Sequence, residues 1–101
     1  QHRKLAEMYP AGYRIFRPNR YMRITTRYPE KFLVTRYQTV KLNETALEMT
    51  QAIQSEAVIN ERALVTRFIE RVEEDETRLF VSKMLQVNAL DLIGEVHHAA
   101  S

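Results

Sequence analysis

The fold class depends on one stretch of the chain, residues 20–42, which read RYMRITTRYPEKFLVTRYQTVKL. From residue 21 to residue 28 the side chains alternate as expected of a half-buried strand, with Met22, Ile24, Thr26 and Tyr28 on one face and Arg23, Thr25 and Arg27 on the other. Residues 32–41 are again rich in β-branched types, and Pro29 suits the second position of a tight turn between the two runs. We therefore predict a β-hairpin over residues 20–41, in which 20–28 pairs with 32–41. Its inner face is predicted to consist of Met22, Ile24, Val34 and Val40.

The same stretch allows a second interpretation. Pro29 is also acceptable as the first residue of a helix, and Leu33, Tyr37 and Val40 would then share one face. The threonines and valines disfavour that helix by roughly a few tenths of a kcal/mol each. The sequence alone leaves open whether residues 29–42 form strand or helix.

After the hairpin, residues 43–98 are predicted to be helical, because proline is absent and apolar residues recur at three- and four-residue spacing. Asn43 and Asn60 are good N-caps, and each is followed by a glutamate in the first turn. The acids at 73–76 would oppose the dipole at a helix C-terminus and suit the next N-terminus, so a break there gives three helices. The alternative is one continuous helix over 60–88, since apolar residues keep a seven-residue spacing across the acids.

These elements give an α+β fold class, with a basic N-terminal arm at 1–19 and a single small domain at 20–101. The domain contains the hairpin and a three-helix C-terminal half, and residues 13–17 are compatible with a further strand. The alternative is an all-α fold with a long helix. Apolar residues at helical spacing are predicted to form a core between the helices and the hairpin, and the alternative is that they line a binding groove. These residues are Leu64, Phe68, Phe80, Met84 and Leu85.

Charge divides the chain into two unlike halves. Residues 1–41 contain ten Lys or Arg and two Glu, a net charge of +8. Residues 42–101 contain five basic and eleven acidic residues, a net charge of −6. All five tyrosines lie in the basic half. A basic, aromatic surface beside an acidic one indicates a binding function.

The arginines of the basic half form the first candidate site. Arginine makes two parallel hydrogen bonds with a phosphate, and tyrosine offers a flat face on which an unpaired base can stack. We therefore predict a non-catalytic module that binds the phosphate backbone of DNA or RNA. The predicted contact residues are Arg14, Arg17, Arg20, Tyr21, Arg23, Arg27, Tyr28 and Arg36.

Arginines also pair with carboxylates, which gives the alternative function. In it, the chain is an assembly subunit whose basic arm docks on acidic helices of a neighbouring copy or of another protein. The acidic docking patch would consist of Glu73, Glu74, Asp75 and Glu76. We expect a homo-oligomer. The sequence leaves open whether the partner is nucleic acid or another protein subunit.

Other functional classes lack support in the sequence. The absence of cysteine excludes thiol catalysis and thiolate metal sites, and it suits the cytoplasm or another reducing compartment, including the nucleus or a virus particle. No phosphate-binding loop or nucleophile motif occurs, so we predict no enzyme, no cofactor and no small-molecule substrate. No apolar run is long enough to span a membrane. Asp91, Glu95 and His98 would share a helix face, but we predict no metal site there.

Overall fold

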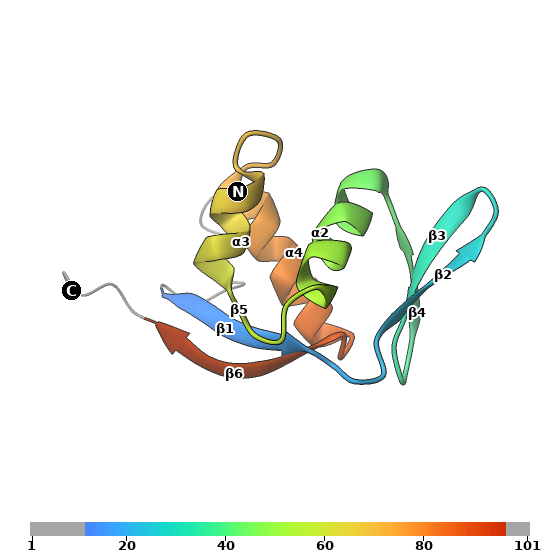
Figure 1. Cartoon of the computed structure of the whole chain (residues 1–101), viewed down its shortest axis with the longest axis horizontal. Helices are drawn as coiled ribbons and strands as arrows, with labels where there is room; N and C mark the ends of the chain where they lie inside the picture. Colours follow the sequence, from blue (N-terminus) through green and yellow to red (C-terminus); the bar gives the residue numbers. More distant parts are fainter. Residues whose placement is uncertain (1–11, 97–101) are drawn as a thin grey trace.

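The computed structural model describes residues 12–96 and shows an α+β fold in which, within those residues, two antiparallel sheets accompany three helices (Figure 1). The first sheet has the strand order β5-β1-β6, and the second has the order β2-β3-β4. In chain order the elements are β1 (Tyr13–Pro18), β2 (Arg23–Arg27), β3 (Glu30–Val34), β4 (Thr39–Leu42), α2 (Glu44–Gln54), β5 (Ile59–Asn60), α3 (Glu61–Phe68), α4 (Glu74–Gln86) and β6 (Leu90–Val96). The predicted fold class is confirmed. None of the helices in this part of the chain has the length and apolar character needed to cross a membrane.

The second sheet contains the predicted hairpin and one strand more. β2 pairs antiparallel with β3, and the chain turns between them at residues 28 and 29. The run predicted as one strand, 32–41, is divided between β3 and β4 by a turn over residues 35–38. In that turn the Thr35 N–H donates to the Gln38 carbonyl at 2.8 Å, and the Thr35 hydroxyl accepts from the Gln38 N–H at 3.0 Å. The helix alternative for this stretch is therefore wrong.

The pairing register decides which side chains of this sheet face the helices. Ile24, Leu33 and Val40 lie opposite one another in β2, β3 and β4. Leu33 is fully buried, while Ile24 and Val40 pack against the core. Val34 follows Leu33 in the strand, so its side chain points to the other face. The prediction for Val34 is wrong, whereas those for Met22, Ile24 and Val40 are confirmed.

The first sheet departs most from the expected organisation. β1 lies between β5 and β6, so residues 13–18 form a middle strand, and an arm that extends to residue 19 is wrong. Residues 1–11 of that arm lie outside the described residues. The helical region expected to reach residue 98 ends with α4, and Asn88 beyond it has a φ of 65°, typical of the residue that follows a helix. The chain then returns as β6, antiparallel to β1.

α2 and α3 begin where the sequence predicts N-caps. The Asn43 side chain accepts from the Ala46 N–H at 2.7 Å, and the Asn60 side chain accepts from the Arg62 N–H at 2.8 Å. Residues 69–73 separate α3 from α4. The predicted break is confirmed, and one continuous helix through the acids is wrong.

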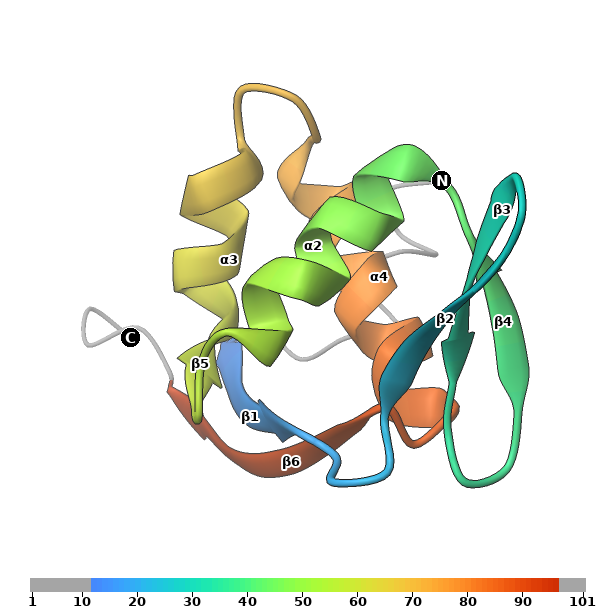
Figure 2. The ribbon, with the colours of Figure 1, turned by 45° about the vertical axis from the view of Figure 1, so that its right-hand side comes forward.

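The core lies where the helices meet both sheets. Figures 1 and 2 show the three helices on one side of the first sheet, with the second sheet beside α2 and α4. Of the predicted core residues, Leu64, Phe68 and Met84 are buried, whereas Phe80 and Leu85 are half-buried at its margin. The largest fully buried apolar side chains of this core are Phe16, Leu33, Ile53, Leu64 and Val81.

Candidate functional site

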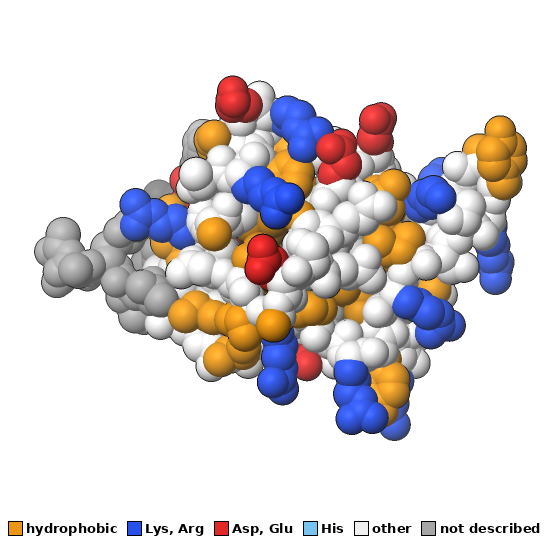
Figure 3. All heavy atoms as spheres, viewed as in Figure 1, with side chains coloured by type: hydrophobic (Ala, Val, Ile, Leu, Met, Phe, Trp, Pro, Cys, Tyr) orange, Lys and Arg blue, Asp and Glu red, His pale blue; other side chains and the backbone are white. Residues whose placement is uncertain are grey.

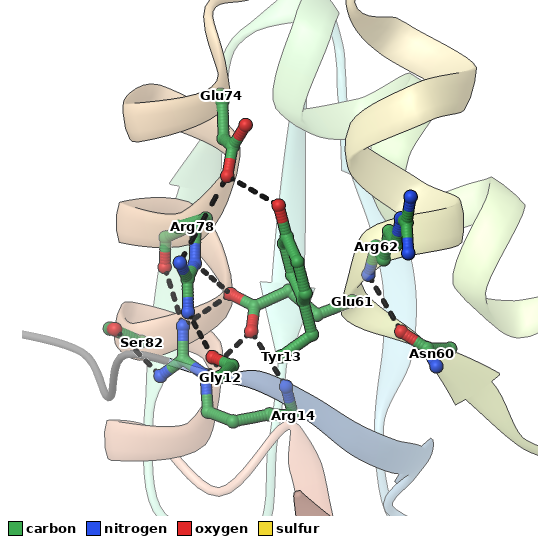
Figure 4. A network of polar contacts seen from close by, with 9 residues as sticks. All are labelled: Gly12, Tyr13, Arg14, Asn60, Glu61, Arg62, Glu74, Arg78 and Ser82. Atoms are coloured by element: carbon green, nitrogen blue, oxygen red, sulfur yellow. Dashed lines mark hydrogen bonds and ion pairs between the residues drawn. The ribbon is translucent and has the colours of Figure 1, made fainter. Parts of the chain in front are cut away.

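The predicted phosphate ligand Arg14 lies inside the molecule (Figure 4). Its Nη2 is 2.6 Å from Glu61 Oε2, its Nε is 3.0 Å from Glu61 Oε1, and its Nη1 donates to the Ser82 hydroxyl at 2.8 Å. Glu61 is fully buried, and Arg78 Nε approaches the same carboxylate at 3.4 Å. The expected position of Arg14 on a binding surface is wrong. Its side chain instead ties β1 to α3 and α4.

The buried groups of this network include more positive than negative charges, because two buried guanidinium groups share one buried carboxylate. Arg78 is 6 % exposed and stacks over the Tyr13 ring, with 4.7 Å between its Cζ and the ring centroid. Its Nη1 is also 4.0 Å from the partly exposed carboxylate of Glu74. Figure 4 shows all of these groups converging between β1, α3 and α4. Glu61 is therefore the residue on which the two buried cations depend.

The tyrosine of this network gives a pH prediction. Tyr13 Oη donates to Glu74 Oε2 at 2.8 Å, and this bond, with partial burial and the charge of Glu74, raises the pKa of Tyr13 above its usual 10.0. A tyrosine pKa raised by folding stabilises the folded state fully below about pH 10, and this stability is lost as the pH rises through the higher pKa of the folded state. We therefore expect the unfolding free energy of the wild type to fall more steeply above about pH 10 than that of Tyr13→Phe. Urea denaturation at a series of pH values measures both slopes, and equal slopes would contradict the expectation.

Two loops at one end of the second sheet bring together four exposed residues, Arg20, Tyr21, Arg36 and Tyr37, which we name the Arg–Tyr cluster. The guanidinium carbons of Arg20 and Arg36 lie 5.0 and 5.3 Å from the Tyr21 ring centroid. Arg36 also lies 5.7 Å from the Tyr37 centroid. Within the described part of the chain, neither arginine is paired with a carboxylate. The ring contacts orient the guanidinium groups and leave their N–H edges available to an anion.

The remaining predicted ligands are divided between the two sheets. Arg23 and Arg27 are exposed on β2, and Tyr28 is 94 % exposed at the hairpin turn. Arg17 belongs to β1 of the first sheet, and its Nε is 3.8 Å from Asp91 Oδ2. In Figure 3 the charged side chains visible over the right-hand end, formed by β2, β3 and β4, are Lys and Arg. The structure thus gathers the predicted basic residues at the second sheet, apart from the two on β1. Tyr37 belongs to the Arg–Tyr cluster but was not among the predicted contact residues.

The predicted acidic patch lies at the start of α4. Glu73 and Glu76 are exposed, and Asp75 is half-buried. Glu74 is partly exposed, and its carboxylate accepts the hydrogen bond from Tyr13. The four acids therefore do not form one uniform outward surface, although Glu73 and Glu76 remain accessible to a basic partner.

A groove of about 730 Å³ lies between the second sheet and α4, and α2 contributes to its lining. Its apolar lining includes half-buried side chains, so part of their surface is accessible to a partner: Val40, Leu79, Phe80 and Val87. Sequence reasoning placed Phe80 in the core. The available signal was the run Leu79-Phe80-Val81, because three successive residues of a helix cannot all face one core. Val81 takes the core position, and its two predecessors line the groove.

One wall of this groove is an open strand edge. β4 pairs only with β3 among the described strands. The hydrogen bond from the Thr35 N–H to the Gln38 carbonyl makes residues 35 and 38 a hydrogen-bonded pair, from which the pairs of the β3–β4 ladder can be counted. In antiparallel pairing, hydrogen-bonded pairs alternate with non-hydrogen-bonded ones, so the backbone groups of Val40 and Leu42 face β3. Those of Thr39 and Lys41 are therefore directed away from β3, toward the open edge.

Four charged residues line the groove, namely Arg71, Glu76, Lys83 in the last turn of α4, and Lys41, which is paired with Glu30. Arg71 lies near the end formed by the start of α4, and it is paired with Glu48 at 2.7 Å. Glu76 lines the same end and adds a negative charge. At the opposite end, the groove reaches Gln38, which directly follows the Arg–Tyr cluster in the chain. The end near this cluster therefore has an excess of positive charge.

Neither a search for metal-binding residues in the described part of the chain nor comparison with known proteins gives a further candidate site. Among residues 12–96, no group of three His, Cys, Asp or Glu side chains is placed to hold a metal ion. Two of the three residues weighed for a metal, Asp91 and Glu95, belong to the strand β6 and not to a helix, and His98 lies outside the described residues. Comparison of the chain with protein-family models, curated proteins and solved structures found no match.

Proposed function

We propose that this chain is a non-catalytic binding module that holds an extended segment of a partner protein as an added strand at β4. The observation that carries the proposal is an edge of β4 that no other strand of residues 12–96 occupies, beside an apolar groove. An edge strand offers main-chain hydrogen bonds to an extended peptide, and pockets for alternate side chains supply specificity. Of the two kinds of partner considered from the sequence, another protein is favoured. The proposed binding surface is the edge of β4, whereas the sequence analysis expected a protein partner to bind at the acidic residues 73–76.

The dimensions of the site suit a short segment. β4 has four residues, and the outward backbone groups of Thr39 and Lys41 can each pair with an incoming strand. Every second side chain of that strand would point into the groove, where Val40 of β4 and Phe80 of α4 are half-buried. Each apolar side chain fully buried in such a groove contributes about 1.5–3 kcal/mol, and each main-chain hydrogen bond about 1 kcal/mol. Two apolar anchors and a few main-chain bonds are therefore the contacts that offset the free-energy cost of association.

The proposal is tested with peptides selected from a random display library against the whole chain. We expect the selected peptides to bind the wild type and to bind Thr39→Pro about tenfold more weakly or worse. The reason is that proline removes the outward N–H of Thr39 and leaves an acceptor of the added strand without its partner. Fluorescence anisotropy with labelled peptides measures both affinities.

The matched control is Thr26→Pro in β2, the other edge of the same sheet. By the alternation of the ladder, the Thr26 backbone also points away from β3, so the change is chemically the same at an edge that does not border the groove. The proposal is contradicted if Thr39→Pro leaves affinity unchanged, or if Thr26→Pro weakens binding equally. It is also contradicted if the chain itself forms dimers that Thr39→Pro abolishes, because β4 would then be occupied by a second copy.

A second candidate function is contact with single-stranded nucleic acid, and the unpaired Arg–Tyr cluster is the observation that favours it. Its arginines can bond phosphates while a base stacks on Tyr37, which is 68 % exposed. With Arg23, three arginines would meet phosphates, which corresponds to a slope of roughly −2 for log affinity against log salt. A labelled single-stranded oligonucleotide that binds with this slope, and weakens on Arg36→Glu, would support this function. Absence of binding at low salt would contradict it.

A further inference from the structure

We infer that the partner segment carries a run of Asp or Glu residues directly after its strand-forming part, and that these carboxylates bind the Arg–Tyr cluster. This inference rests on the proposed function, because it places the acidic run by reference to β4. It adds the charge and the chain direction of the partner to that function.

The position of the cluster along β4 is the first argument. The turn at residues 35–38 leads into β4, so Arg36 and Tyr37 lie just before Thr39 in the chain. A segment paired with β4 that continues past Thr39 reaches this turn within two or three residues, since an extended chain advances about 3.3 Å per residue. There it meets Arg36, and the guanidinium group of Arg20 lies on the same Tyr21 ring as that of Arg36.

The difference in charge between the two ends of the groove is the second argument. The end near Thr39 has arginines that, within residues 12–96, bind only aromatic rings. At the other end, Arg71 already pairs with Glu48, and Glu76 adds a negative charge. Carboxylates are therefore attracted to the first end and not to the second, and forked guanidinium groups are well suited to bind them.

The direction of the segment follows from the sheet. The strand pairs β2–β3 and β3–β4 are both antiparallel. A strand added antiparallel to β4 continues the same pattern, and its C-terminal end then lies beside Thr39. The acids therefore follow the strand-forming residues and do not precede them.

The test examines the composition of peptides selected from the random library. We expect an alternating apolar stretch followed by Asp or Glu, and about tenfold weaker binding to the double variant Arg20→Glu/Arg36→Glu. The matched control is Arg62→Glu/Arg67→Glu, which makes the same change in net charge at two exposed residues of α3. Peptides in which the acids are replaced by Gln should lose the distinction between these two variants.

The outcomes separate this inference from the proposed function. Selected peptides that depend on Thr39 but carry no excess of acids overturn the inference and leave the proposed function intact. Equal weakening by both double variants also overturns the inference, because it shows a long-range charge effect and not a contact. Peptides that do not depend on Thr39 overturn both. An oligonucleotide that loses affinity on Arg20→Glu/Arg36→Glu, while the peptides do not, assigns the Arg–Tyr cluster to nucleic acid and overturns the inference.

Discussion

Glu61→Gln is expected to lower the free energy of unfolding by about 3–5 kcal/mol, because it removes the one buried negative charge that Arg14 and Arg78 share. Arg14 and Arg78 are 5 % and 6 % exposed, so water cannot replace the lost partner. The next carboxylate, Glu74, is 4.0 Å from Arg78 and partly exposed, and cannot neutralise both cations. Glutamine keeps the volume of the side chain, so the loss reports charge and hydrogen bonding and not a cavity. Urea denaturation followed by circular dichroism measures the change.

The control for this result is Glu48→Ala, which removes the carboxylate of an exposed ion pair. Arg71 and Glu48 are separated by 2.7 Å, a distance as short as those of the buried network, but their side chains are 52 % and 40 % exposed. Solvent-exposed pairs of this kind contribute about 0–1 kcal/mol. If Glu61→Gln were no more destabilising than Glu48→Ala, the network would not join β1 to α3 and α4 as described.

The same network shows why part of the candidate site was not predictable. Arg14 belongs to a series of arginines spaced three or four residues apart, and this series looks like one basic stripe. Its carboxylate partner, Glu61, is 47 positions away in the chain, and no local pattern links the two. Arg20 and Arg36 share the ring of Tyr21 only because β2 and β3 bring their loops together. The residue types of the site were predictable, but which arginines stay exposed depends on long-range pairing.

Local signals gave a more accurate account of the fold. The side chains of Asn43 and Asn60 form their cap bonds within three residues of the chain, and the hairpin turn at Pro29 involves only its neighbours. β6, in contrast, is a strand because β1 lies beside it, more than 70 residues earlier in the sequence. The groove has the same origin, since its walls are β4 and α4. The two helix caps and the hairpin turn were predictable because their contacts are local, whereas β6 and the groove depend on segments far away in the sequence.

Two adjacent residues of β3, Leu33 and Val34, lie on opposite faces of the sheet, and substituting each one by alanine tests which of them faces the core. Leu33→Ala is expected to lower the free energy of unfolding by about 2–5 kcal/mol, because it removes a fully buried side chain packed against the core. Val34→Ala should cost less than about 1.5 kcal/mol, since Val34 is half-buried on the opposite face and outside the core cluster. Both variants keep a strand-compatible backbone, so the comparison isolates the register. A β-branched pattern alone predicts Val34 as the inward residue, and a shift of one position exchanges the two faces. A larger loss for Val34→Ala than for Leu33→Ala would therefore show that β3 pairs one residue out of the register described.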